Sequence, residues 1–223
     1  MVKAVIFDMY ETLITLHACP LYFSAEMAAD AGIPVEDFRG AWYPSEMDRT
    51  LGKLTLEQAL TPVLERFGRY SEELLALMGE KRRAAKRASF DHLHPEVLPM
   101  LRALKARGVK IGLITNCFLE EAEYIRQSEL YPFFHTAMLS CVEGLAKPDE
   151  AIFHRCTAGL GVAPHECLYV GDGGSRELET AQGLGMQAAQ AVWYLKEGTL
   201  QPKGRMPEFT QLETPMDVLG MLG

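Results

Sequence analysis

A short apolar run near the start of the chain ends abruptly at a carboxylate. Residues 4–7 read AVIF, which is typical of a strand buried on both faces of a parallel sheet. Asp8 follows directly, and a carboxylate at the end of a buried strand costs desolvation energy unless a cation, a metal ion or hydrogen-bond donors stabilise it. Because open α/β sheets bind ligands at the carboxyl ends of their strands, Asp8 is the first candidate functional residue.

The second half of the chain alternates short apolar runs with longer amphipathic ones. Further strands are predicted at 109–114, 135–140, 167–170 and 187–194. Helices are predicted at 95–106, 118–129, 149–159 and 175–183. Parallel strands need crossover connections of this length, so the pattern predicts an α/β fold with a Rossmann-like parallel sheet. The segment 199–223 is expected to pack against this sheet as a closing element.

Residues 17–89 follow a different pattern, because their periodicity is helical throughout and no strand is indicated. Helices are predicted at 21–31, 35–43, 54–67 and 71–87, and Thr55 with Gln58 matches a capping box. We therefore predict an all-helical cap domain, 17–89, inserted into a catalytic core formed by 1–16 and 90–223. A domain inserted beside the strand end that carries Asp8 is positioned to act as a lid.

The composition excludes several classes of partner. The chain has 223 residues and a net charge of −8, so we expect neither nucleic acid nor an anionic membrane as a partner, whereas a small anionic substrate remains compatible. Asp8 and Glu11 interrupt what would be the apolar part of a secretory signal. The five cysteines are widely spaced, without a metal-ligand pattern. We therefore expect a cytoplasmic protein with free thiols.

Polar residues occur at the ends of the predicted strands and in the loops that follow them. The candidates are Asp8, Thr12, Thr115, Asn116, Lys147, Asp172 and Glu177. Taken singly, each has an ordinary structural explanation: Thr115 is compatible with a helix N-cap, Lys147 with an exposed loop charge, and Asp172 with a turn. Because the carboxyl ends of parallel strands meet at one edge of a sheet, we expect these side chains to converge there.

The order of these residues resembles the four motifs of the haloacid dehalogenase superfamily of hydrolases. The matching segments are Asp8-x-x-x-Thr12, Thr115, Lys147-Pro148, and Gly171-Asp172 with Glu177. The resemblance implies a Rossmann-like sheet with strand order 5-4-1-2-3 and a small helical cap after the first strand. It also implies that Asp8 is a nucleophile that forms an aspartyl-enzyme intermediate.

The resemblance further implies a Mg²⁺ site. The ion would be held by the carboxylates of Asp8 and Asp172 and by the backbone carbonyl of Tyr10, with Glu177 acting through a water molecule. Thr115, Asn116 and nearby backbone N–H groups would bind the oxygens of the transferring group, while Lys147 would neutralise charge. The expected activity is phosphate release from small phosphate monoesters.

One position departs from the phosphatase pattern. Family phosphatases usually carry an aspartate two residues after the nucleophile, as the general acid and base, and this chain has Tyr10 there. A phenol is a poor base at neutral pH, and losing such a group typically costs about 10²–10⁴-fold in rate. Asp-x-Tyr-x-Thr is similar to the metal-independent 2-haloacid dehalogenases of the superfamily, in which Arg39 would bind the halide. Glu11 is a second candidate for the missing acid.

Three hypotheses remain open. The first is a Mg²⁺-dependent phosphatase; Asp172 and Glu177 favour it, since clustered carboxylates repel one another unless a cation is present. The second is a metal-independent dehalogenase of small 2-haloacids. The third is a catalytically weakened relative that binds a phosphorylated ligand or a protein partner. For any substrate, the expected contacts from the cap are Arg39, Tyr43, Arg49 and Lys53.

Overall fold

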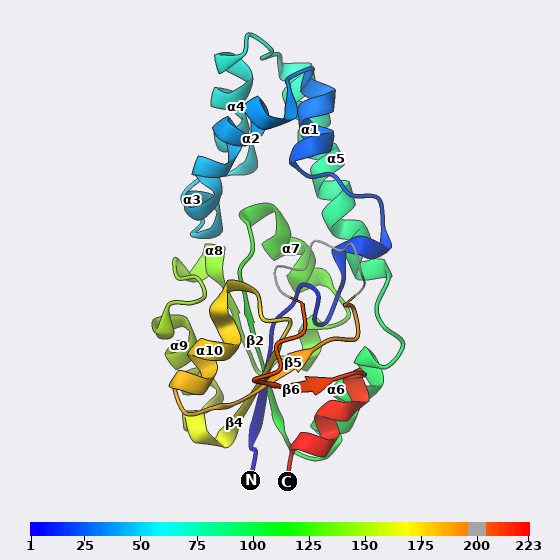
Figure 1. The fold of residues 1–223 in the computed structure, drawn as a ribbon, viewed down its shortest axis with the longest axis vertical. Coiled ribbons are helices and arrows are strands. Elements are labelled where there is room, and N and C mark those ends of the chain that lie inside the picture. Colours follow the sequence, from blue (N-terminus) through cyan, green and yellow to red (C-terminus); the bar gives the residue numbers. More distant parts are fainter. Residues whose placement is uncertain (196–203) are drawn as a thin grey trace.

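A computed structural model describes residues 1–195 and 204–223 (Figure 1). Its centre is a parallel sheet of six strands in the order β3-β2-β1-β4-β5-β6. The strands are β1 (Ala4–Phe7), β2 (Lys110–Thr115), β3 (Thr136–Leu139), β4 (Cys167–Gly171), β5 (Gln187–Ala191) and β6 (Thr210–Leu212). The order of the first five confirms the expected Rossmann-like sheet, in which β1 lies between β2 and β4.

Strand β6 was not predicted. It is short and carries Thr210 and Gln211, so it has no apolar run to indicate a strand; its pairing with β5 forms it. The 3-10 helix Pro215–Met221 that follows packs on α6 (Val97–Ala106), and Figure 1 shows it beside α6 at the end of the molecule far from the cap. This part of the chain closes the core as expected, whereas 199–203 lies outside the described residues.

Helices cover both faces of the sheet because side chains alternate along each strand. Val5 and Phe7 of β1 face the side covered by α6 and α7 (Leu119–Gln127). Ala4 and Ile6 face the side covered by α9 (Glu150–Leu160) and α10 (Glu177–Gly183). A short helix, α8 (Ser140–Glu143), follows β3. The result is a three-layer sandwich whose strands end toward the cap (Figure 1).

Helix α10 begins later than predicted. Ser175 and Arg176 have φ angles of 52° and 54°, in the left-handed region, so the regular helix starts at Glu177. Glu177 therefore lies in the first turn of α10, directly after the loop that carries Asp172. Its carboxylate turns into the core, where the side chain is fully buried.

The cap consists of helices that share an apolar core of their own, between Tyr22 and Met78. They are α1 (Ser24–Ala31), α2 (Val35–Trp42), α3 (Glu46–Thr50), α4 (Leu56–Arg66) and α5 (Glu72–Ala88). The capping box at the start of α4 forms as expected, with Gln58 N–H donating to Thr55 Oγ1 over 3.2 Å. Helix α3 was not predicted, because its five residues EMDRT carry no apolar periodicity.

The cap and the core meet through two helix pairs. Helix α5 packs against α7, and α3 packs against α8. In Figure 1 the cap lies above the carboxyl ends of the strands, and both chain termini lie at the opposite end. Among the described residues, every helix is too short or too polar to cross a bilayer.

Candidate active site

The loops after β1, β2 and β4 border a cavity of about 280 Å³ below the cap. Asp8 follows β1, Asn116 follows β2 and Asp172 follows β4, while Lys147 precedes α9 and Glu177 opens α10. All five line this cavity. The parallel sheet brings them together because every strand ends at the same edge.

Lys147 is the centre of the charge network. Its Nζ lies 2.5 Å from Asp8 Oδ1, and it also donates to Glu177 Oε2. Tyr169 of β4 donates its hydroxyl to the same Glu177 oxygen over 2.9 Å, and the other Glu177 oxygen accepts from Gly173 N–H over 3.2 Å. Burial opposes the charge on Lys147, but the carboxylates of Asp8 and Glu177 outweigh that effect and raise its pKa. Lys147 is therefore a fixed cation.

The carboxylates of Asp8, Asp172 and Glu177 crowd one point, with one oxygen from each within 4.8 Å of the others. Burial is the largest cause that raises the pKa of each of them, and repulsion by a neighbouring carboxylate adds to it, only partly offset by Lys147. Among the described residues, the hydrogen-bond donors and Lys147 therefore leave part of this negative charge uncompensated.

This donor set fits a magnesium ion, which prefers hard oxygen ligands and keeps several waters. Asp8 and Asp172 line the cavity and suit direct contact. Glu177 suits contact through water, because both of its oxygens already accept hydrogen bonds from the protein. Tyr10 also lines this cavity.

The loop that carries Asp172 depends on glycine. Gly173 has a φ of 97°, which other residues rarely adopt, and the next residue, Gly174, donates its N–H to Asp172 Oδ1 over 2.8 Å. A side chain at Gly171 would overlap the Glu177 carboxylate. Close approach of the backbone to Glu177 is thus the reason for glycine at the end of β4.

Two of the predicted catalytic residues do not line the cavity. Thr12 and Thr115 are fully buried, and neither hydroxyl has a hydrogen-bond partner among the described residues. Thr115 ends β2 directly before Asn116, which does line the cavity. An unpaired buried hydroxyl costs free energy, so both positions are compatible with binding a polar ligand after a small movement.

The Tyr10 side chain lies near Lys86 and Glu121. Burial raises the pKa of its hydroxyl well above the ordinary value, and the charge of Glu121 on α7 raises it further. Lys86 Nζ lies 5.0 Å from the centre of the Tyr10 ring, at the junction between α5 and α7. This phenol is therefore protonated and is directed at the junction of the cap and the core.

The Glu11 carboxylate accepts hydrogen bonds from the turn that follows it. Glu11 has a φ of 57°, in the left-handed region, and its carboxylate accepts from Thr15 Oγ1 and from Leu16 N–H, both over 2.8 Å. Those bonds stabilise the turn that leads into the cap. Glu11 lines the catalytic cavity and therefore lies near the site. Both of its carboxylate oxygens already accept hydrogen bonds from the protein.

The predicted cap contacts separate into two groups. Arg39, Tyr43 and Arg49 line a second cavity of about 410 Å³, between the cap and the start of α7. Lys53 does not line either cavity, and its ammonium pairs with Asp48 over 3.1 Å on the surface. The reason is that Lys53 lies beyond the end of α3, on the exposed side of the loop.

Sequence reasoning missed several residues of the site. Tyr169 was interpreted only as part of a buried strand, and Ser175, whose Oγ accepts from Asn116 Nδ2 over 3.3 Å, only as part of a helix. His17 and Phe23 also line the catalytic cavity. A hydroxyl in the otherwise apolar run of β4, two residues before Gly171, was the available signal for Tyr169.

Comparisons with known proteins show the family of this chain. A model of the haloacid dehalogenase-like hydrolases matches residues 2–185. A glyceraldehyde 3-phosphate phosphatase from Methanopyrus kandleri is 26% identical over 240 residues, which cover 100% of this chain and 97% of that protein. A solved 2-haloacid dehalogenase from Pseudomonas syringae pv. Tomato DC3000 is also 26% identical, with a TM-score of 0.71 and coverage of 100% and 98%. The chain belongs to the family of haloacid dehalogenase-like hydrolases.

Proposed function

We propose that this chain is a Mg²⁺-dependent phosphatase of small phosphate monoesters, with Asp8 as its nucleophile. The observation that carries the proposal is the convergence of Asp8, Asp172 and Glu177 on one point. Repulsion in such a cluster is relieved by a divalent cation, and a metal-independent hydrolase has no need of it. The resemblance to a glyceraldehyde 3-phosphate phosphatase over the whole chain supports the same activity.

The residues can perform both steps of the reaction. A carboxylate oxygen of Asp8 attacks phosphorus, the bond from phosphorus to the ester oxygen breaks, and the leaving oxygen takes a proton from solvent. Water then attacks phosphorus, the bond to Asp8 breaks, and inorganic phosphate leaves. Lys147 fixes the Asp8 carboxylate over 2.5 Å and offsets its charge as the phosphoryl group approaches.

Magnesium would be held by Asp8, Asp172 and the Tyr10 carbonyl, with Glu177 acting through water, and would supply positive charge beside the transferring group. The side chain of Tyr10 gives no help to the leaving oxygen, because it is directed at Glu121. We therefore expect the best substrates to have acidic leaving groups, which depart without a proton.

A 2-haloacid dehalogenase is the second candidate. Tyr10 and the resemblance to the Pseudomonas syringae dehalogenase favour it. Arg39 counts against it, because its guanidinium donates to Ser24 Oγ over 3.1 Å, pairs with Glu36 over 2.8 Å, and lines the other cavity rather than the one that contains Asp8. The third hypothesis, a weakened relative that only binds ligand, predicts no turnover of either substrate class.

Parallel assays distinguish these activities. Hydrolysis of p-nitrophenyl phosphate and of 2-chloropropionate is measured with Mg²⁺ and with EDTA, for the wild type, for Asp8→Asn and for the control Asp37→Asn, an exposed aspartate of the cap. We expect phosphate release that EDTA abolishes, that added Mg²⁺ restores, and that is lost in Asp8→Asn but retained in Asp37→Asn. Halide release that is indifferent to EDTA would establish the dehalogenase, and no turnover of either compound would support the binding protein.

A further inference from the structure

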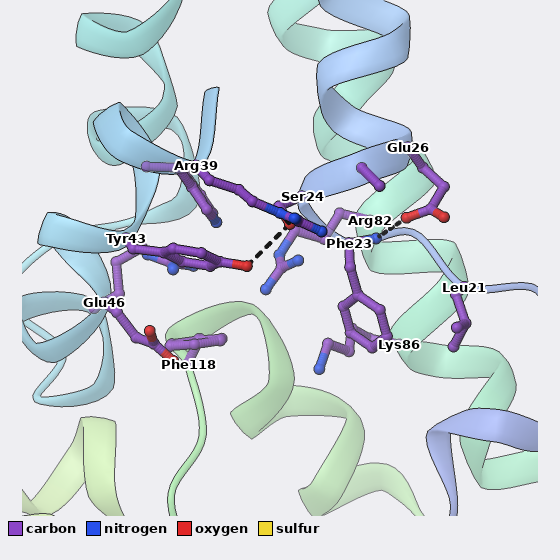
Figure 2. A pocket seen from close by; sticks show the side chains of 13 residues that line it. Leu21, Phe23, Ser24, Glu26, Arg39, Tyr43, Glu46, Arg82, Lys86 and Phe118 are labelled. Carbon is purple, nitrogen blue, oxygen red and sulfur yellow. Dashed lines mark hydrogen bonds between the residues drawn. The ribbon is translucent and has the colours of Figure 1, made fainter. Parts of the chain in front are cut away.

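The second cavity is rich in positive charge. Four cationic side chains line it, Arg39, Arg49, Arg82 and Lys86, against two carboxylates, Glu26 and Glu46. Figure 2 shows Arg82 and Lys86 of α5 extending from one side, with Tyr43 and Glu46 on the other. Figure 2 also shows Phe118, at the start of α7, below the same space.

Most of these cations already have acidic partners. Arg39 pairs with Glu36 over 2.8 Å, Arg82 Nε lies 3.2 Å from Glu120 Oε1, and Lys86 Nζ lies 2.7 Å from Glu121 Oε1. The Arg82 and Lys86 pairs are buried and join the cap helix α5 to the core helix α7. Their charge is therefore largely compensated within the protein.

Arg49 differs from the other three. Its side chain is 2% exposed, and no carboxylate of the described residues lies within ion-pair distance of it. Its Nε donates to Ser45 Oγ over 3.2 Å, while the buried Nη1 has no acceptor among those residues. Burial, with the nearby charge of Arg82, lowers the pKa of Arg49 to about 10. A buried guanidinium left in this state is costly.

Aromatic rings hold the Arg49 guanidinium in place. Its Cζ lies 3.8 Å from the centre of the Trp42 ring and 4.3 Å from that of Phe118. Trp42 ends α2 in the cap, whereas Phe118 precedes α7 in the core. The cation is thus fixed by both domains, and its orientation does not depend on a carboxylate of the described residues.

The two cavities adjoin each other. Phe23 lines both of them. Lys86, which lines the second cavity, lies 5.5 Å from the Phe23 ring centre and 5.0 Å from that of Tyr10, which lines the catalytic cavity. A ligand with its phosphoryl group at Asp8 would pass these side chains to reach Arg49.

We propose that Arg49 binds a second anionic group of the substrate, a carboxylate or a second phosphoryl group, on the organic part of a phosphate monoester. The planar guanidinium fork matches either oxyanion, and the buried Nη1, which has no acceptor in the described part of the chain, is the donor that such a group would satisfy. The inference rests on the proposed phosphatase function for the group that binds at Asp8.

Matched substrates test this assignment. We would compare kcat/KM for 4-methylphenyl phosphate with that for 4-(carboxymethyl)phenyl phosphate and 4-(phosphonomethyl)phenyl phosphate, whose leaving phenols are similar. The wild type should prefer at least one acidic compound by about tenfold or more, the range for a charged hydrogen bond. Whichever acidic compound is preferred identifies the oxyanion. Equal values for all three compounds would overturn the proposal.

Variants then assign the preference to Arg49. Arg49→Met keeps the long apolar stem between the two rings and should reduce the ratio of acidic to neutral kcat/KM to near unity. Arg49→Lys keeps the positive charge but lacks the planar guanidinium, so it should give an intermediate ratio of acidic to neutral kcat/KM. This variant tests the assignment even if Arg49→Met does not fold. The control is Arg66→Met, an exposed arginine on α4, which should keep the wild-type ratio. A preference that survives in Arg49→Met would contradict the assignment.

A binding measurement separates failure of this site from failure of the phosphatase proposal. If no phosphate ester is hydrolysed, the proposed function fails, and titration calorimetry with 4-hydroxyphenylacetate and 4-methylphenol still tests Arg49. Binding of the acid but not of the neutral phenol, lost in Arg49→Met, would support an anion site on its own. Equal binding of both compounds, or of neither, would overturn it.

Discussion

The Asn116 side chain and the Lys147 backbone form two hydrogen bonds with each other. Asn116 Oδ1 accepts from Lys147 N–H over 2.8 Å, and Asn116 Nδ2 donates to Lys147 C=O over 3.0 Å. The amide orientation follows from the chemistry, since a backbone N–H requires an oxygen and a carbonyl requires an N–H. The loop after β2 therefore fixes the residue whose ammonium binds Asp8.

Asn116→Leu tests this positioning role. The substitution removes both bonds at similar volume, and the backbone of Lys147 is then free to shift by a fraction of an ångström. We expect kcat with p-nitrophenyl phosphate to fall by about 100-fold, because small displacements of reacting groups are this costly. Asn116→Asp, which keeps one acceptor, should give a smaller loss. A kcat in Asn116→Leu equal to that of the wild type would show that Lys147 is held by other contacts.

Tyr10→Phe tests whether the phenol takes part in proton transfer. The hydroxyl is buried, is directed at the Glu121 carboxylate, and has a raised pKa. We expect kcat to stay within about threefold, far from the losses of a missing general acid. Tyr169→Phe is the contrast, because it removes a donor to Glu177 and should lower kcat. A large loss of kcat in Tyr10→Phe would show that the phenol takes part in catalysis.

Glu121→Gln tests the buried junction between the cap and the core. Burial opposes ionisation of Glu121, but the charges of Lys86 and Arg82 and the Phe118 N–H outweigh it and lower its pKa below 4.5. A lowered folded-state pKa stabilises the protein above pH 4.5, and this contribution disappears as the pH falls through the folded-state value. We expect Glu121→Gln to cost about 3–5 kcal/mol of unfolding free energy at pH 7, since it leaves buried cations uncompensated.

Urea unfolding as a function of pH measures this effect. The difference in unfolding free energy between the wild type and Glu121→Gln should be constant near neutrality and should shrink below pH 4.5. Glu123→Gln, at an exposed position of the same helix, should stay within about 0.5 kcal/mol of the wild type. A difference that does not change with pH would mean that the loss comes from packing rather than from charge.

Local sequence predicted much of the core. The apolar run 4–7 and the alternation of strands and helices were sufficient for the sheet, because burial on both faces of a parallel sheet imposes a pattern that few other structures share. The carboxylates at the strand ends converge for the same reason, since parallel strands end at one edge. Helix α3 and strand β6 were not predicted, because each is short and is formed by contacts with distant segments.

By itself, the sequence determined the α/β core, a helical segment between the first strand and the rest of the sheet, and the convergence of Asp8, Lys147 and Asp172. Only the tertiary structure decided where side chains of ambiguous role point. It directs Tyr10 toward Glu121, places the Glu11 carboxylate in the hydrogen bonds of a turn, and leaves Arg49 buried without an acidic partner among the residues described. The physical reason is that periodicity specifies which face of an element is buried, whereas the partner of a buried charge depends on how the cap and the core pack together.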